Sequence, residues 1–364
     1  MEAYNTVPNK KFSICQNCNE VEMLPIRRML APFLYPEKVQ LAEQFSYGHR
    51  EAILASNKLD PSSIFLASIP HGWGPDSPGI PYPKTFSRQL QEYPILTWSE
   101  RSTIDLKSRG YRMPLTAGSP WAHLLTSIYG SDQNALIDQS RTQVDSLLYF
   151  PSHSVPGANH PHDSDVSLLL KSLRPKKITV CLFWLDFINP NIRELYERYN
   201  FELVCVGFKG STGFDVPWAP IGGREIFLAT LFKLISTHDI IACETISTPF
   251  WYAASLRKKL FLTSSSASLT WWGESRIRSL QINSLELLEL VGAELVKLDL
   301  NQVILPSDYI QHIALSELGW SHTSDFSELI QKHKLLKTGV LPHSLVEPML
   351  TFVNTESQIF RDSK

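Results

Sequence analysis

Two hydroxyl-bearing residues, Ser247 and Thr248, stand between an apolar run and a predicted helix, where their chemistry suits an anionic ligand. The apolar run at 240–242, which follows Asp239, is short enough for a buried parallel strand. Pro249 follows the hydroxyls and suits the first position of a helix. A hydroxyl-rich turn at a helix N-terminus, beyond the carboxyl end of a strand, is where α/β proteins hold anionic groups such as phosphate. The sequence therefore predicts a phosphate site here, with hydroxyls that only cap the helix as the alternative.

Two histidines follow predicted strands and are candidates for acid–base chemistry. His71 comes after the strand expected at 64–67, and Gly72 and Gly74 permit a close approach of the backbone beside it. His153 follows the first strand expected in the second half of the chain. An imidazole at such a position can act as a general base or bind a substrate hydroxyl. We expect His71 to be catalytic and His153 to bind substrate, and a His71 that only bonds a loop carbonyl is the alternative.

Three charged residues complete the candidate site, and each has a structural alternative. Asp186 comes just after the strand expected at 178–183, where it either reaches the ligand or caps a turn. Arg224 opens the helix expected at 224–236, and a cation opposes the helix dipole there, so it indicates an anionic partner or plain solvent exposure. Glu244 would be repelled by phosphate, so we assign it to a ribose or sugar hydroxyl, or to orienting the turn.

The sequence gives little support for a metal site. Cys15 and Cys18 form a lone CxxC without a second ligand pair, and His160 and His162 have no partner ligands at matching spacing. We therefore expect no metal ion and no other cofactor.

Length and composition limit the class of protein. A chain of 364 residues is too long for one ordinary core, so we expect two domains. A net charge of −2 gives no electrostatic argument for nucleic-acid binding. The sequence shows no apolar signal core at its start and no run of membrane-spanning length. Five cysteines, an odd number without a signal peptide, indicate a reducing compartment, so we expect a cytoplasmic protein.

Strand and helix patterns alternate along the chain, which predicts an α/β fold with parallel sheets. The expected strands lie at 64–67, 94–98, 112–116, 146–150, 178–183, 202–207, 240–243 and 260–262. The expected helices lie at 100–108, from 121, near 164–173, 190–199, 224–236, 249–256 and 285–290, and from 325 onward. We predict an N-terminal α/β domain over 1–144, a second α/β domain over 145–330 and a helical segment over 331–364. Two such domains would face each other across a cleft.

Several of these segments together resemble bacterial glycosyltransferases of the GT-B fold, especially those of capsule and lipopolysaccharide synthesis. The matching pieces are IFLASIPHGWG, ILTWSERS, LLYFPSHS, ITVCLFWLDF and HDIIACETISTPFWYAASLRKKLFL. The resemblance implies two Rossmann-like domains that face a cleft. It also implies that the second domain binds the nucleotide sugar through a strand–Ser/Thr–helix unit, and that the first domain carries the acceptor side and the base. The expected partners are therefore a nucleotide sugar donor and a glycan or lipid-linked acceptor.

The chain departs from the pattern of such enzymes in two places. Sialyl- and Kdo-type transferases often carry a His-Pro pair upstream of a Ser-Ser/Thr pair, but His160-Pro161 precedes the strand that it should follow. The Asp-x-Asp of metal-dependent transferases is absent between apolar runs, which favours a metal-independent mechanism. A sugar-nucleotide epimerase, a polyol-phosphate transferase and a non-catalytic binding homologue remain alternatives. A lipid-linked acceptor would bring the protein to the inner face of the membrane as a peripheral protein.

Overall fold

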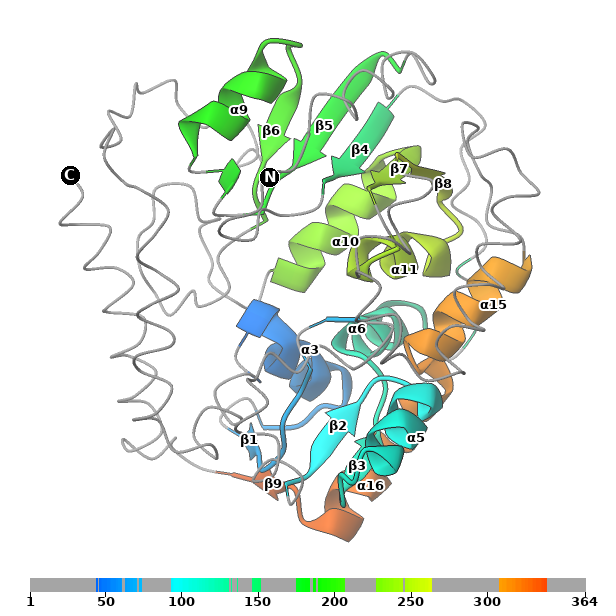
Figure 1. Cartoon of the computed structure of the whole chain (residues 1–364). Helices are drawn as coiled ribbons and strands as arrows, with labels where there is room; N and C mark the ends of the chain where they lie inside the picture. The colour runs from blue at the N-terminus through cyan, green and yellow to red at the C-terminus, as the bar shows by residue number, and fades with distance from the viewer. Residues whose placement is uncertain are drawn as a thin grey trace, which may run out of the picture.

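The computed structural model contains a five-stranded parallel sheet and two two-stranded pairs, which a single bridge joins into what we call the smaller sheet, with helices between and around these sheets (Figure 1). The structure describes residues 44, 46–60, 63–70, 72–73, 93–130, 132, 136, 146–151, 175–183, 186–187, 189–206, 227–244, 246–263 and 308–338.

The larger sheet is parallel throughout and has the strand order β6-β5-β4-β7-β8. Its strands are β4 (Ser146–Phe150), β5 (Lys177–Cys181), β6 (Glu202–Val204), β7 (Ile240–Cys243) and β8 (Lys259–Leu262). Its helices are α9 (Pro190–Glu197), α10 (Phe227–Thr237) and α11 (Thr248–Ser255). All four residues of β7 are buried apolar residues, as expected for a central parallel strand covered on both faces. Because the chain leaves β4 in one direction for β5 and β6 and returns to the other side for β7, a topological switch point lies between β4 and β7.

The smaller sheet is assembled from both ends of the described chain. Its parallel pair is β2 (Ile95–Thr97) and β3 (Pro114–Thr116), and its antiparallel pair is β1 (Ile64–Phe65) and β9 (Leu336–Lys337). A bridge between Ser68 and Ile95 connects the two pairs. The helices near it are η1 (Ser46–Gly48), α3 (His49–Ser56), α5 (Glu100–Ser108), α6 (Pro120–Tyr129), η5 (Trp320–His322) and α16 (Phe326–His333). Helix α15 (Asp308–Glu317) packs mainly against α11.

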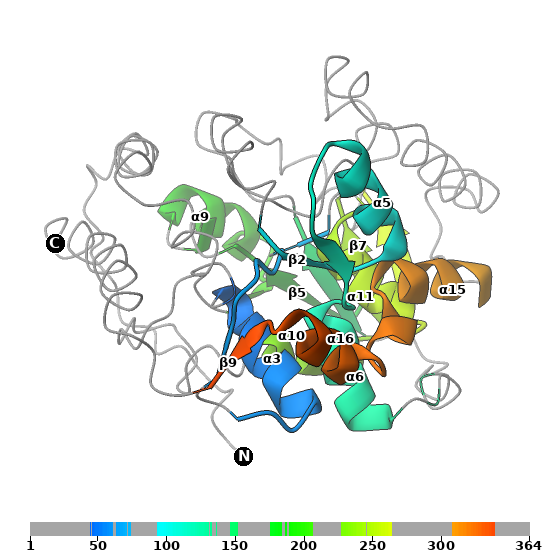
Figure 2. The ribbon, with the colours of Figure 1, turned by 90° about the horizontal axis from the view of Figure 1, so that it is seen from below.

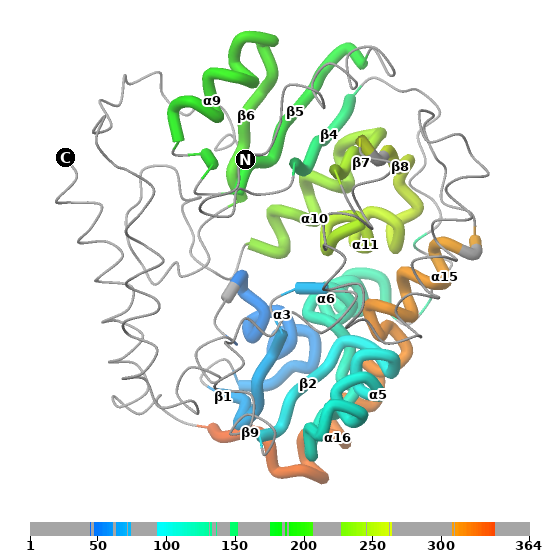
Figure 3. The backbone as a smooth tube through the Cα atoms, in the orientation of Figure 1, coloured from blue at the N-terminus to red at the C-terminus, as the bar shows by residue number. Residues whose placement is uncertain are grey.

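The segment from α15 to β9 lies against the first half of the chain, although it comes last in the sequence. The orange and red tube of these residues runs beside the blue and cyan tube of the first half (Figure 3). Seen from below, β9 and α16 share one side of the molecule with α3 and α6 (Figure 2). Phe326 and Ile330 of α16 belong to the same buried cluster as Phe65 and Leu96. The division of the chain at residues 144 and 330 stays a prediction, and these contacts connect 326–336 to the smaller sheet.

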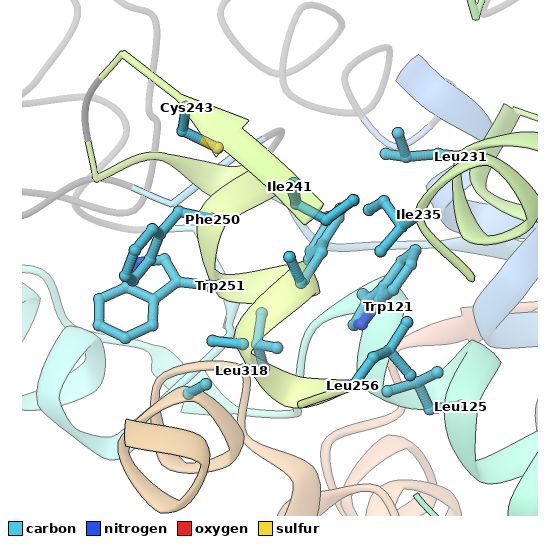
Figure 4. Packing of buried hydrophobic residues seen from close by; sticks show 14 of the residues in the cluster. Trp121, Leu125, Leu231, Ile235, Ile241, Cys243, Phe250, Trp251, Leu256 and Leu318 are labelled. Atoms are coloured by element: carbon cyan, nitrogen blue, oxygen red, sulfur yellow. The ribbon is translucent and has the colours of Figure 1, made fainter. Parts of the chain in front are cut away.

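One continuous hydrophobic core joins the two sheets. Trp121 of α6 stacks on Tyr252 of α11 with the ring centroids 4.1 Å apart and the planes 5° from parallel. The same cluster includes Leu125 from the first half and Ile235 and Ile241 from the second (Figure 4). Stacked aromatic side chains contribute about 0.5–1.5 kcal/mol beyond the apolar area that they bury. The two halves therefore share a packed interior where α6 meets α11.

The α/β fold class with parallel sheets is confirmed, and the expected strands fall at the observed ones from β1 to β8. The helices expected near 164–173 and 285–290 lie outside the described residues. The helical pattern from 325 onward did not predict β9, which pairs with β1. Within the described parts of the chain, no helix is both long and apolar enough to cross a bilayer.

A buried histidine of α6 makes the stability of this fold depend on pH. His123 is 1% exposed, and its Nε2 lies 3.0 Å from the Ala117 carbonyl oxygen, which can only accept a proton. Nδ1 is therefore the acceptor of the neutral ring, and the Asn57 amide donates to it over 3.1 Å. Burial lowers the pKa of His123 to about 4, and the hydrogen bond to Ala117 opposes that shift.

We expect His123 to destabilise the protein in acid. Its folded pKa lies below the value of 6.5 for an unperturbed histidine, so its contribution is fully present above pH 6.5 and is lost as the pH falls through about 4. The loss is on the order of 3 kcal/mol of unfolding free energy between pH 7 and pH 4. Urea unfolding of wild type and His123→Gln at both pH values measures it. Parallel losses in the two proteins would contradict the assignment.

Candidate functional site

The candidate site lies where β4 and β7 end side by side at the switch point. Phe150, the last residue of β4, pairs with Cys243, the last residue of β7. The Glu244 main-chain N–H donates to the Phe150 carbonyl over 3.3 Å, so the two strands stay together to their ends. Glu244 is half-buried, and α11 begins four residues later at Thr248. The polar turn predicted from the sequence thus follows a central strand at the switch point.

Ser247 occupies the N-cap position of α11, but its side chain makes no capping hydrogen bond. Burial raises the pKa of the thiol of Cys243, the last residue of β7, and interaction with the Ser247 side chain acts in the opposite direction. Capping therefore does not account for this serine.

The serines at two other helix starts behave differently. Ser99 Oγ accepts a hydrogen bond from the Ser102 N–H over 3.2 Å at the start of α5, and Ser119 Oγ accepts one from the Ala122 N–H over 3.1 Å at the start of α6. Such caps typically contribute about 1 kcal/mol to stability. Ser99 and Ser119 therefore cap their own helices. Of these three serines at helix starts, only Ser247 makes no capping hydrogen bond with its own helix.

Thr248 connects α11 to the first half of the chain. Its Oγ1 accepts a hydrogen bond of 2.8 Å from the main-chain N–H of Trp73, which lies 175 residues away in sequence. A Cβ added to Gly72 would stand 3.2 Å from the same oxygen, so the absence of a side chain at Gly72 permits this approach. The loop that follows β1 therefore reaches the start of α11.

A buried carboxylate holds the other end of Trp73. The indole Nε1–H donates to Glu317 Oε2 over 2.7 Å. Arg101 donates to Glu317 from Nε over 2.8 Å and from Nη2 over 2.7 Å, which makes a two-pronged ion pair. The side chains of Arg101 and Glu317 are 15% and 5% exposed. The sequence did not predict Trp73, Glu317 and Arg101 as a group, and a tryptophan between two glycines is its one local signal.

Of the remaining predicted site residues, the structure describes Asp186 only. Asp186 is 2% exposed and lies between β5 and α9, and the N-cap side chain of α9 is Asn189. Three others, His71, His153 and Arg224, lie outside the described residues. The structure thus brings Glu244, Ser247 and Thr248 together at one strand end, and the roles of all seven residues stay predictions. Among the residues that the structure covers, no group of three or more His, Cys, Asp or Glu side chains gathers as metal ligands would.

Comparisons with known proteins return weak structural likenesses only. No family model matches the chain, and no curated protein matches it. The wall teichoic acid polymerase TagF is 13% identical with a TM-score of 0.38, and the match covers 69% of this chain and 60% of the polymerase. The UDP-GlcNAc 2-epimerase from Neisseria meningitidis, bound to UDP-GlcNAc, is 15% identical with a TM-score of 0.36, over 74% of this chain and 69% of the epimerase. S. aureus MnaA with UDP is 11% identical with a TM-score of 0.40, over 84% of this chain and 97% of MnaA.

Proposed function

We propose that this chain is a metal-independent glycosyltransferase, which moves a sugar from a nucleotide-activated donor to a glycan or lipid-linked acceptor of a surface polysaccharide. One observation carries the proposal: α11 begins at the switch point of a doubly wound sheet, and the Ser247 side chain does not cap it. Parallel sheets of this kind bind ligands beyond the carboxyl ends of their strands at that point. A helix start without a side-chain cap has main-chain N–H donors available for phosphate oxygens.

The chemistry of sugar transfer suits such a helix start. Breaking the bond between sugar and nucleotide leaves negative charge on the phosphate, and the positive end of the helix dipole and nearby hydroxyls stabilise that charge. We propose that Arg224 pairs with the phosphate, and that Asp186, Glu244 and His153 bind hydroxyls of the donor. His71 would take the proton from the acceptor hydroxyl while the oxygen of that hydroxyl attacks the sugar carbon and the bond to the phosphate breaks.

Nucleotide binding is the first test of this proposal. Thermal melts of the purified chain with UDP, CMP, GDP and their common sugar conjugates should show a rise in Tm for at least one nucleotide. Ligand at a hundred times its Kd stabilises the folded state by about 2.7 kcal/mol. A chain that is stabilised by none of these nucleotides is not a nucleotide-sugar enzyme of this kind.

Product analysis with the sugar nucleotide that binds then separates the enzyme classes. A transferase releases free nucleotide only when an acceptor is added. An epimerase isomerises the sugar without acceptor, and a binding homologue does neither. Because the TM-scores above lie below 0.5, the polymerase and the two proteins that bind UDP or UDP-GlcNAc do not decide between these classes. Under our proposal the enzyme acts in the cytoplasm, at the inner face of the membrane when its acceptor is lipid-linked.

A further inference from the structure

Trp73 is held at three points by residues of other elements. Its indole N–H donates to Glu317 of α15 over 2.7 Å. The Arg101 guanidinium carbon lies 5.9 Å from the centroid of the indole ring, a distance at which a cation is attracted to an aromatic face. The Trp251 ring of α11 packs against it at a centroid separation of 5.2 Å. These contacts leave the indole little freedom to change its rotamer.

Glu317 is a rigid anchor for this indole. Its carboxylate is buried, and its oxygens accept from Arg101 Nε and Nη2 as well as from Trp73 Nε1. A buried ion pair keeps its geometry because removing either partner leaves an uncompensated charge in the interior. The planar guanidinium further fixes the carboxylate plane, since two parallel N–H groups meet its oxygens. The direction in which Glu317 presents Oε2 to the indole is therefore set by α5 and α15.

A fixed indole also fixes the main-chain N–H of the same residue. That N–H donates to Thr248 Oγ1 over 2.8 Å and occupies one of the two acceptor positions of the hydroxyl oxygen. The Thr248 hydroxyl can then donate its own proton to a second partner. A Cβ added to Gly72 would lie 3.2 Å from the same oxygen, so the main chain at Gly72 already packs closely against the Thr248 side chain.

We propose that Trp73 is a positioning residue for the donor site: it aligns the Thr248 hydroxyl so that this hydroxyl donates to a phosphate oxygen bound at the start of α11. This inference rests on the proposed function and deepens it. It assigns the alignment of the phosphate site to Trp73, which Arg101 of α5 and Glu317 of α15 hold in place. The donor site would thus be complete only with the contact between Trp73 and Thr248.

The test compares two tryptophans that undergo the same substitution. Trp73→Phe keeps an aromatic ring and removes the hydrogen bond to Glu317. Trp98→Phe is the matched control, because the buried Trp98 Nε1 has no hydrogen-bond partner in the described part of the chain. Calorimetric titration uses UDP, CMP and inorganic pyrophosphate as probes. We expect Trp73→Phe to raise the Kd of the bound probe by about threefold to 30-fold, as for coupled neighbouring residues, and Trp98→Phe to change it by less than about twofold.

A second comparison separates positioning from general loss of structure. In a Thr248→Ala background, Trp73→Phe should cause no further rise in Kd, because the hydroxyl that it aligns is gone. Equal effects of Trp73→Phe in the two backgrounds, or an unchanged Kd in folded Trp73→Phe protein, would overturn the inference. Where Trp73→Phe does not fold, Glu317→Gln replaces it in both backgrounds, since it removes the charge that holds the indole and preserves the side-chain size.

The outcomes also distinguish this inference from the proposed function. Where wild type binds none of the three probes, the titrations use GDP, and a wild-type chain that binds none of the four refutes both. A wild-type chain that binds a probe and loses affinity in Thr248→Ala but not in Trp73→Phe keeps the phosphate site and refutes only the positioning role.

Discussion

Removing both hydroxyls at the start of α11, by Ser247→Ala together with Thr248→Ala, should weaken nucleotide binding at least about 100-fold. Each hydrogen bond to a charged group contributes on the order of 1.5–3 kcal/mol, and tenfold in affinity corresponds to about 1.4 kcal/mol. The stability of the fold should fall much less. Ser247 makes no capping bond whose loss would cost stability, and the loss at Thr248 is one hydrogen bond with the Trp73 N–H. Calorimetric titration of the nucleotide into both proteins measures the ratio of the dissociation constants.

Ser119→Ala provides the matched control at another helix start. Its hydroxyl caps α6 and is fully buried, so its removal should cost about 1 kcal/mol of unfolding free energy and leave the nucleotide affinity unchanged. The two substitutions should therefore give opposite balances between affinity and stability. Equal dissociation constants for wild type and the Ser247, Thr248 double variant would end the phosphate assignment for this turn.

The larger sheet was predictable from the sequence because each of its strands carries its own signal. The residues of β7, for example, are an unbroken apolar run between Asp239 and Glu244, as the both-sided burial of a central parallel strand requires. The hydroxyl turn after β7 was readable for the same reason. A polar cluster between a strand and a proline-initiated helix is a local pattern, and the position of a strand end fixes where such a cluster lies.

The parts that could not be predicted depend on contacts between distant residues. Nothing near Leu336 indicates that it pairs with Phe65, because a two-residue strand has no periodicity of its own. Likewise, Glu317 sits at the end of an ordinary helix, and its burial follows only from the approach of Arg101 and Trp73. The sequence also could not show whether Ser247 caps α11, because Ser99 and Ser119 stand in similar sequence contexts and do cap their helices.

Gly319→Ala should unfold the part of the protein around the smaller sheet, or lower the unfolding free energy of the protein by more than about 4 kcal/mol. Gly319 has a φ of +68°, and a Cβ there would lie 1.8 Å from the Trp98 carbonyl oxygen and 2.9 Å from the Gly118 Cα. Both neighbours are main-chain atoms at the ends of β2 and β3, which cannot move aside as a flexible side chain would. The Ser119 N–H also donates to the Leu318 carbonyl over 2.8 Å at this crossing, so a shift of the backbone would break that bond too. Urea unfolding monitored by circular dichroism measures the loss.

Gly130→Ala separates the steric clash from backbone strain. Gly130 has a φ of +70° and a ψ of −153°, a conformation that only glycine adopts readily, and a Cβ added there meets nothing within 4 Å, so its substitution should cost only roughly 1–3 kcal/mol of backbone strain. The excess loss in Gly319→Ala then measures the close passage of η5 over the ends of β2 and β3. This close contact places the residues after α15 against the first half of the chain, next to Glu317, which binds Arg101. Similar losses of unfolding free energy in the two variants would mean that there is room for a side chain at Gly319. The contact of η5 with the ends of β2 and β3 would then not require glycine.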